Sequence, residues 1–138
     1  ELRSEEMEVI NLRIQAKYRE IEEKEVRFEE FMLDDADYAI VAFGSAARIA
    51  KKSIEIARSQ GIKVGLLRPI TLWPFPTKEV QKLAGQVKGI LSLEINAGQM
   101  VEDIRLAVEG RVPVRHFGRL GGIIPDPDEV VEALKRSF

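Results

Sequence analysis

The chain has 138 residues, the length of one domain that can bury a sizeable core, and it is 45% hydrophobic and 32% charged. Its formal net charge of -2 gives no reason to expect nucleic acid or a membrane surface as a partner. No apolar run is long enough to span a membrane and no signal-peptide pattern is present, so we expect a cytoplasmic protein. Because it contains no cysteine, disulfides, thiolate zinc sites, cysteine nucleophiles and iron–sulfur ligation are excluded within this sequence.

The first 33 residues are compositionally separate. They carry ten glutamates against six lysines and arginines, a balance of -4, and they contain no glycine or proline. Their apolar residues recur at helical spacing, at Met7, Ile10, Ile14, Tyr18 and Ile21. Since Lys17 and Lys24 interrupt a heptad seam, we expect a helix with one apolar face docked on a neighbouring domain; the alternative is a solvated charged helix.

A change from helical to alternating period predicts a short strand at Val26–Phe31. The polar turn Asp34–Asp37 then marks the boundary between segment 1–33, a linker from an upstream domain, and a domain at 34–138. The chain begins at Glu1 and not at methionine, so we expect it to be a piece of a longer protein. Few asparagines and many lysines and glutamates are typical of proteins from hot environments.

From residue 38 the pattern repeats strand, glycine turn, helix. We predict strands at Tyr38–Phe43, Lys63–Leu67, Gly89–Glu94 and Val112–Phe117. We predict helices at Ala46–Ser59, from Thr77 to about Gly85, from Gly98 to Glu109, and after Asp126. Such alternation predicts a parallel α/β sheet covered by helices on both faces.

Three side chains are expected to begin these helices. Ser45 and Thr77 are placed to act as N-caps. Asp126 is followed by Pro127 in the first turn and by Glu129 three residues later, which matches a capping box. The acidic run at this position is therefore explained without a metal ion.

Ligands of such sheets bind beyond the carboxyl ends of the strands. Gly44 and Ser45 follow one strand and offer a possible anion site at a helix N-terminus. However, the glycine pattern of a dinucleotide site is absent, with Ala47 and Ile49 where later glycines are required, and no Gly-Lys-Ser/Thr triplet occurs. A plain N-cap is the better interpretation of Ser45.

Glu94, Asn96 and Gln99 cluster after another buried strand. A carboxylate acid or base needs a partner, and no nucleophile or second carboxylate stands nearby in the sequence, so we favour structural hydrogen bonds or interface contacts over catalysis. His116, the sole histidine, cannot build a metal site alone and is interpreted as a packed or edge residue.

A stiff loop follows the strand at Lys63–Leu67, because prolines fix its backbone and remove donors. It carries Trp73 and Phe75 out of regular structure. Such large apolar surface requires cover. Either both rings pack under the loop, or they face another domain or subunit.

The succession YAIVAFGS, VGLLRPITLWPFP, ILSLEINAGQMVEDIR, HFGRLGG and IPDPDEV resembles the C-terminal part of the alpha subunit of 2-oxoacid:ferredoxin oxidoreductases. More distantly it is similar to the C-terminal domain of transketolases and of pyruvate dehydrogenase beta subunits. The resemblance covers nearly the whole chain. It implies a three-layer α/β/α fold with a five-stranded, mostly parallel sheet whose first strand, Val26–Phe31, is antiparallel, preceded by an N-terminal helix.

In this family a 2-oxoacid is decarboxylated on thiamine diphosphate with magnesium, electrons pass through iron–sulfur clusters to ferredoxin, and the acyl group goes to coenzyme A. The sequence has no Gly-Asp-Gly run of a thiamine diphosphate site and no cysteine for a cluster. We therefore expect no catalytic, cofactor-binding or metal-binding residue here and an inactive isolated fragment.

The resemblance implies a structural role in domain and subunit assembly. Its expected partners are an upstream pyrimidine-binding domain, the beta and other subunits, and ferredoxin through the complex. The residues expected at these contacts are Arg68, Trp73, Phe75, Glu94, Asn96, Gln99 and Arg119. Two alternatives stay open: a small-molecule or anion-binding module without catalysis, and a self-contained enzyme of flavodoxin-like shape.

Overall fold

A five-stranded sheet forms the centre of the protein in the computed structural model, which describes residues 3–138. The strands are β1 (Phe28–Phe31), β2 (Tyr38–Ala42), β3 (Val64–Pro69), β4 (Gly89–Glu94) and β5 (Val114–Gly118). Their order in the sheet is β1-β3-β2-β4-β5. β1 pairs antiparallel with β3, Phe28 lying opposite Pro69, and all other neighbours are parallel.

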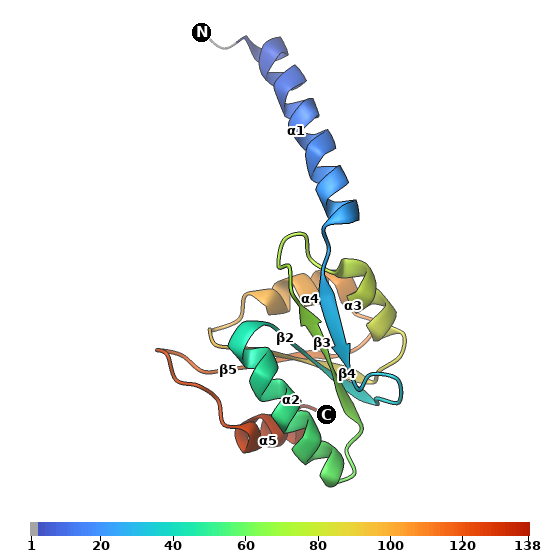
Figure 1. The fold of residues 1–138 in the computed structure, drawn as a ribbon, viewed down its shortest axis with the longest axis vertical. Helices are drawn as coiled ribbons and strands as arrows, with labels where there is room; N and C mark the ends of the chain where they lie inside the picture. The colour runs from blue at the N-terminus through green and yellow to red at the C-terminus, as the bar shows by residue number, and fades with distance from the viewer. Residues whose placement is uncertain (1–2) are drawn as a thin grey trace.

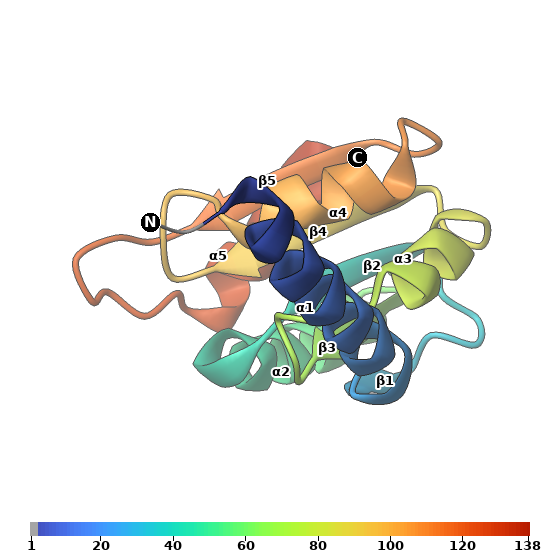
Figure 2. The same ribbon diagram turned by 90° about the horizontal axis from the view of Figure 1, so that it is seen from above.

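Helices cover both faces of this sheet, as Figures 1 and 2 show. The helices are α1 (Ser4–Lys24), α2 (Gly44–Ser59), α3 (Thr77–Ala84), α4 (Met100–Val108) and α5 (Pro127–Ser137). α2 and α5 pack together on one face, and α3 and α4 pack together on the other. The predicted three-layer α/β/α class with an antiparallel first strand is confirmed.

The hydrophobic core consists of two clusters separated by the sheet. Neighbouring residues of β2 alternate between them: Ile40 packs toward α2 and α5, and Val41 packs toward α3 and α4. Both are at most 1% exposed. This is why the central strands read as continuous apolar runs, since each of their faces meets a helical layer.

Helix α1 differs from the other four because none of its residues is buried. In Figure 1 it projects away from the sheet and continues into β1. Tyr18 on this helix contacts Trp73 edge to face, with ring centroids 5.5 Å apart. No helix within residues 3–138 has the length and apolar character needed to cross a membrane.

Several predicted boundaries require correction. β1 begins at Phe28 and not at Val26, because residues 25–27 leave α1 in an irregular connection. β5 runs from Val114 to Gly118, two residues later at its start than predicted, and α4 is shorter at both ends than predicted.

Two predicted N-caps are wrong. Ser45 lies inside the first turn of α2, whose N-cap is Phe43, and Thr77 is the first residue of α3, after Pro76. Neither helix has a capping side chain.

The predicted N-terminus of α5 is confirmed. Asp126 accepts a hydrogen bond from the Asp128 backbone N–H at 2.9 Å, and Glu129 accepts one from the Asp126 N–H at 2.9 Å.

Candidate functional site

The topological switch point of the sheet lies between the carboxyl ends of β2 and β4. These strands are neighbours, yet β2 connects through α2 to β3 on one side, and β4 connects through α4 to β5 on the other. In open α/β sheets this is the place where ligands bind. The loop between β4 and α4 lies at this edge of the sheet and holds Asn96 and Gln99, two of the polar residues singled out from the sequence.

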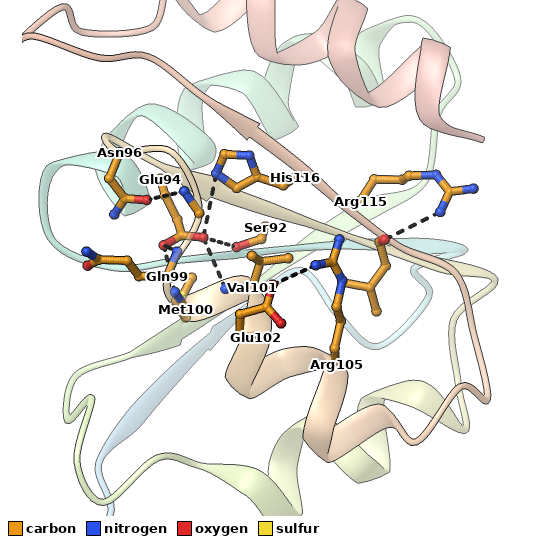
Figure 3. A network of polar contacts seen from close by, with 12 residues as sticks. Ser92, Glu94, Asn96, Gln99, Met100, Val101, Glu102, Arg105, Arg115 and His116 are labelled. Atoms are coloured by element: carbon orange, nitrogen blue, oxygen red, sulfur yellow. Dashed lines mark hydrogen bonds and ion pairs between the residues drawn. The ribbon is translucent and has the colours of Figure 1, made fainter.

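Glu94, the last residue of β4, is completely buried. Its Oε1 accepts hydrogen bonds from the backbone N–H groups of Gln99 at 3.1 Å and Met100 at 2.8 Å. Its Oε2 accepts from the Val101 N–H at 3.1 Å and from the Ser92 hydroxyl at 2.9 Å. Figure 3 shows these donors converging on the carboxylate. Glu94 thus caps the N-terminus of α4 from a neighbouring strand, and all four lone-pair positions of the carboxylate are used.

This arrangement keeps Glu94 ionised. Burial by itself raises the pKa of a carboxyl group, but the N–H groups of Met100 and Gln99, the Ser92 hydroxyl and the Val101 N–H outweigh it. The pKa of Glu94 is therefore lowered from its ordinary value of 4.5. The positive end of the α4 dipole acts in the same direction.

His116 on β5 lies on the other side of the carboxylate. Its Nε2 atom is 3.7 Å from Oε2 of Glu94, is buried, and has no hydrogen-bond partner within residues 3–138. Gly98 and Gly118 lie beside the imidazole: a Cβ at Gly98 would be 3.5 Å from its Nε2, and one at Gly118 would be 2.8 Å from its Cε1. The ring therefore occupies a close-fitting space that larger residues at these two positions would fill.

The loop before α4 is also fixed locally. The side-chain oxygen of Asn96 accepts a hydrogen bond from the Gly98 N–H at 2.7 Å. The structure thus brings together three of the predicted contact residues, Glu94, Asn96 and Gln99. Asn96 is half-buried and Gln99 is exposed, whereas Glu94 has no solvent-exposed surface.

Sequence reasoning missed the contributions of Ser92 and His116. A signal for Ser92 was present, because residues two apart on a strand point to the same face, and a serine is unusual in an otherwise apolar strand. No such signal existed for His116, since its position beside Glu94 depends on β5 pairing with β4.

Two predicted arginines lie elsewhere and are engaged in ion pairs. Arg68 contacts Glu29 on the adjacent strand at 2.9 Å, and Glu29 also binds Lys51. Hydrogen bonds from Lys51 and Arg68 lower the pKa of Glu29. Arg119 pairs with Glu129 of the α5 capping box. Neither arginine joins the Glu94 network.

The two aromatic residues of the proline loop have different environments. Phe75 packs against the core under α3 and α4, whereas Trp73 is 55% exposed. Trp73 and Phe75 line a groove of about 570 Å³ at the base of α1, together with Val26, Phe28 and Thr77 among others.

Chemically, the switch point offers a saturated carboxylate, and the titratable side chain beside it is the imidazole of His116. Within residues 3–138, no group of three histidine, aspartate or glutamate side chains could hold a metal ion. At the end of β2, Gly44 has a positive φ of 57°, which glycine adopts without strain, and the Ser45 side chain is exposed.

Comparison with known proteins shows to which family the chain belongs. The chain is 45% identical over 130 residues to the ketoisovalerate oxidoreductase subunit VorB of Methanothermobacter thermautotrophicus, which covers 94% of this chain and 37% of that relative. It is 30% identical over 112 residues to the 2-oxoglutarate synthase subunit KorA of Methanothermobacter marburgensis, covering 81% of this chain and 30% of the relative. The chain thus spans about a third of the length of these relatives.

Solved structures confirm the fold. A 2-oxoglutarate:ferredoxin oxidoreductase from Magnetococcus marinus, with 2-oxoglutarate, coenzyme A and succinyl-CoA bound, matches with a TM-score of 0.84 at 20% identity, over 99% of this chain and 24% of that one. A split-gene transketolase, an inactive tetramer, matches with a TM-score of 0.68 at 18% identity, over 79% and 41%. The family model for the pyruvate:ferredoxin oxidoreductase core domain II matches residues 36–130, and the chain belongs to that family.

Proposed function

We propose that this chain is a non-catalytic assembly domain in the alpha subunit of a cytoplasmic, thiamine-diphosphate-dependent 2-oxoacid:ferredoxin oxidoreductase. The whole enzyme would convert a 2-oxoacid to acyl-CoA and reduce ferredoxin. Membership of the core domain II family and the similarity to VorB and KorA subunits support the type of enzyme. Thiamine diphosphate, magnesium, the iron–sulfur cluster and the coenzyme A site would belong to other domains or subunits.

One observation carries the structural role: the state of Glu94. At the switch point, the most favourable place for a ligand in this fold, the buried carboxylate has four donors from its own chain within 3.1 Å. A catalytic carboxylate needs a free oxygen within hydrogen-bond reach of its substrate. Glu94 instead joins β4 to the N-terminus of α4, which fixes the loop carrying Asn96 and Gln99 at the molecular surface.

The residues of this chain do not fit thiamine diphosphate. No Gly-Asp-Gly run is present to begin its metal-binding loop, and the buried carboxylate has no open acceptor position. We therefore assign no catalytic step to any residue of this chain. Its contribution to the enzyme is a rigid α/β body with defined surfaces for neighbouring domains and subunits.

The test compares the 138-residue chain with the assembled oxidoreductase that contains the full-length subunit. Both are assayed for 2-oxoacid-dependent and coenzyme A-dependent reduction of ferredoxin, and the chain alone is titrated with thiamine diphosphate and magnesium by calorimetry. We expect activity only from the assembly and no heat of binding from the chain. Turnover or tight cofactor binding by the chain alone would overturn the proposal.

The same preparation distinguishes the alternative of an anion-binding module. Titration with inorganic phosphate, followed by backbone amide NMR shifts, should leave Gly44 and Ser45 unchanged if the domain is purely structural. Saturable shifts confined to these two amides would instead favour a ligand site at the N-terminus of α2.

A further inference from the structure

Helix α1 carries an apolar stripe that residues 3–138 leave largely exposed, with Trp73 contacting only its Tyr18 end. The stripe, called the docking stripe below, consists of Met7, Ile10, Ile14 and Tyr18, which are 44%, 42%, 36% and 43% exposed. Their spacing of three and four residues places them along one side of a helix of 21 residues, or about 31 Å. The stripe occupies the part of this helix from Met7 to Tyr18, about 17 Å, and large apolar side chains aligned in this way mark an interaction surface.

The docking stripe continues onto the body of the domain through Trp73. Its indole contacts Tyr18 edge to face and remains 55% exposed, so Tyr18 and Trp73 form one continuous apolar surface. The groove of about 570 Å³ at the base of α1 adjoins this surface. In Figure 1 the loop between β3 and α3 rises beside the last turn of α1, where helix and body meet. Tryptophan and tyrosine are the residues most enriched at the energetic centres of interfaces.

A second copy of the same helix is a poor occupant for this stripe. Relative to Ile10, the positions one and two heptads later are Lys17 and Lys24, which would bring lysines into the seam of a coiled coil. In an antiparallel pair, Glu5 and Glu6 of the first turn would also face the partner's last turn, where Glu22 and Glu23 outnumber Lys24. Repulsion between these like charges opposes the pairing of two copies of α1.

The length of the relatives shows how many further residues a subunit of this kind has that could cover the stripe. The 130 aligned residues are 37% of the VorB subunit, which implies a total of about 350 residues, so about 220 have no counterpart here. The alignment omits only eight residues of this chain, so most of α1 lies inside the matched region. The helix thus belongs to the shared architecture of a much longer subunit.

We infer that the docking stripe and Trp73 pack against another domain of the same longer subunit, and that α1 is the element through which the α/β body is fixed to it. This rests on the proposed function, because it requires the chain to be one domain of an oxidoreductase subunit. The surface that receives α1 is apolar at its centre and acidic where it meets Lys17, which lies one heptad after Ile10 at the edge of the stripe.

The inference is tested in the assembled oxidoreductase with the subunit at full length. A photoreactive amino acid replaces Ile14 in the docking stripe or, as the matched control, Leu12, which is 61% exposed and lies on the opposite side of α1. We expect cross-links from position 14 to residues of the same subunit outside these 138 residues, and several-fold fewer from position 12. Equal yields from both positions, or cross-links from position 14 to a second copy or to a different subunit, would overturn the inference.

A second measurement needs no substitution. Amide hydrogen exchange of residues 7–21 is compared between the 138-residue chain and the assembly. Packing of the docking stripe predicts exchange in the assembly that is slower by at least about tenfold, because covered helices open less often. Unchanged exchange would contradict the inference, and it would leave the proposed non-catalytic role standing, since that role is tested by turnover and cofactor binding.

Discussion

The Nε2 atom of His116 lies 3.7 Å from Oε2 of Glu94 and is buried without a hydrogen-bond partner in the described part of the chain. The two residues come from neighbouring parallel strands, and Glu94 also holds the first turn of α4. The imidazole thus faces a carboxylate whose acceptor positions are already occupied by Ser92 and three backbone N–H groups. The pair thus places the last strand of the sheet beside the carboxylate that holds the loop at the switch point.

Replacement of Glu94 by glutamine should destabilise the domain strongly. Glu94→Gln keeps the shape but removes the charge and turns an amide group toward backbone N–H donors, so that at least one or two buried donors lose their acceptor. We expect the free energy of unfolding to fall by about 3 kcal/mol, measured by urea denaturation at pH 7.

The matched control for this substitution is Glu102→Gln. Glu102 is exposed and pairs with Arg105 one turn later on α4 at 2.7 Å. Its loss should change the free energy of unfolding by less than about 0.5 kcal/mol. Equal losses of unfolding free energy from the two substitutions would show that the hydrogen bonds of Glu94 do not stabilise the domain more than an exposed ion pair does.

The lowered pKa of Glu94 predicts acid sensitivity. Because its folded-state pKa lies below the ordinary value of 4.5, its stabilising contribution is complete above that value and is lost as the pH falls through the folded-state pKa. Between pH 7 and pH 3.5 the unfolding free energy of the wild type should therefore fall more steeply than that of Glu94→Gln. The pKa values of Glu29, Asp35 and Asp37 are also lowered, but these groups are present in both proteins, so the difference in slope isolates Glu94.

The environment of His116 predicts its tautomer. In the neutral tautomer that carries its hydrogen on Nδ1, the lone pair of Nε2 would face the negative charge of Glu94. We therefore expect the other tautomer, with the ring hydrogen on Nε2. Long-range ¹H–¹⁵N NMR of the histidine ring, recorded at a pH where the ring is neutral, distinguishes the two tautomers. A hydrogen on Nδ1 would show that the ring does not interact with Glu94 in this way.

Gly118 should not tolerate a side chain. A Cβ at this position would clash with the carbonyl oxygen of Asn96 and would lie 2.8 Å from Cε1 of His116. Gly118→Ala is expected to lower the free energy of unfolding by about 2 kcal/mol through overpacking. Gly85→Ala is the control, because a Cβ there would meet only the Lys82 carbonyl oxygen at 3.3 Å. Thermal unfolding of both variants provides the comparison.

The sequence predicted most elements because their signals are local. Buried runs such as Gly89–Glu94 have both faces covered, so hydrophobicity alone reveals them. The capping box at Asp126 and Glu129 was equally visible, since its hydrogen bonds join residues three apart. The two incorrect N-caps, Ser45 and Thr77, have the right residue type, but α2 and α3 begin from Phe43 and Pro76 without side-chain caps.

The candidate site was predicted in part. Glu94, Asn96 and Gln99 were singled out together, and they do lie together, because they are close in sequence at the end of one strand. Their roles could not be derived from the sequence. The burial of Glu94 depends on the β5 strand beside it and on the path of the chain into α4, and neither is a local property.

By itself, the sequence determined the fold class, the positions of the strands and helices within a few residues, and the family, because hydrophobic period, turn residues and motif order act over short stretches of chain. Only the tertiary structure decided that the carboxylate of Glu94 is saturated by its own chain, that Phe75 is covered while Trp73 meets Tyr18, and that the apolar side of α1 is left open. These properties depend on which distant segments meet in space, and hydrogen-bond saturation and burial exist only once they have met.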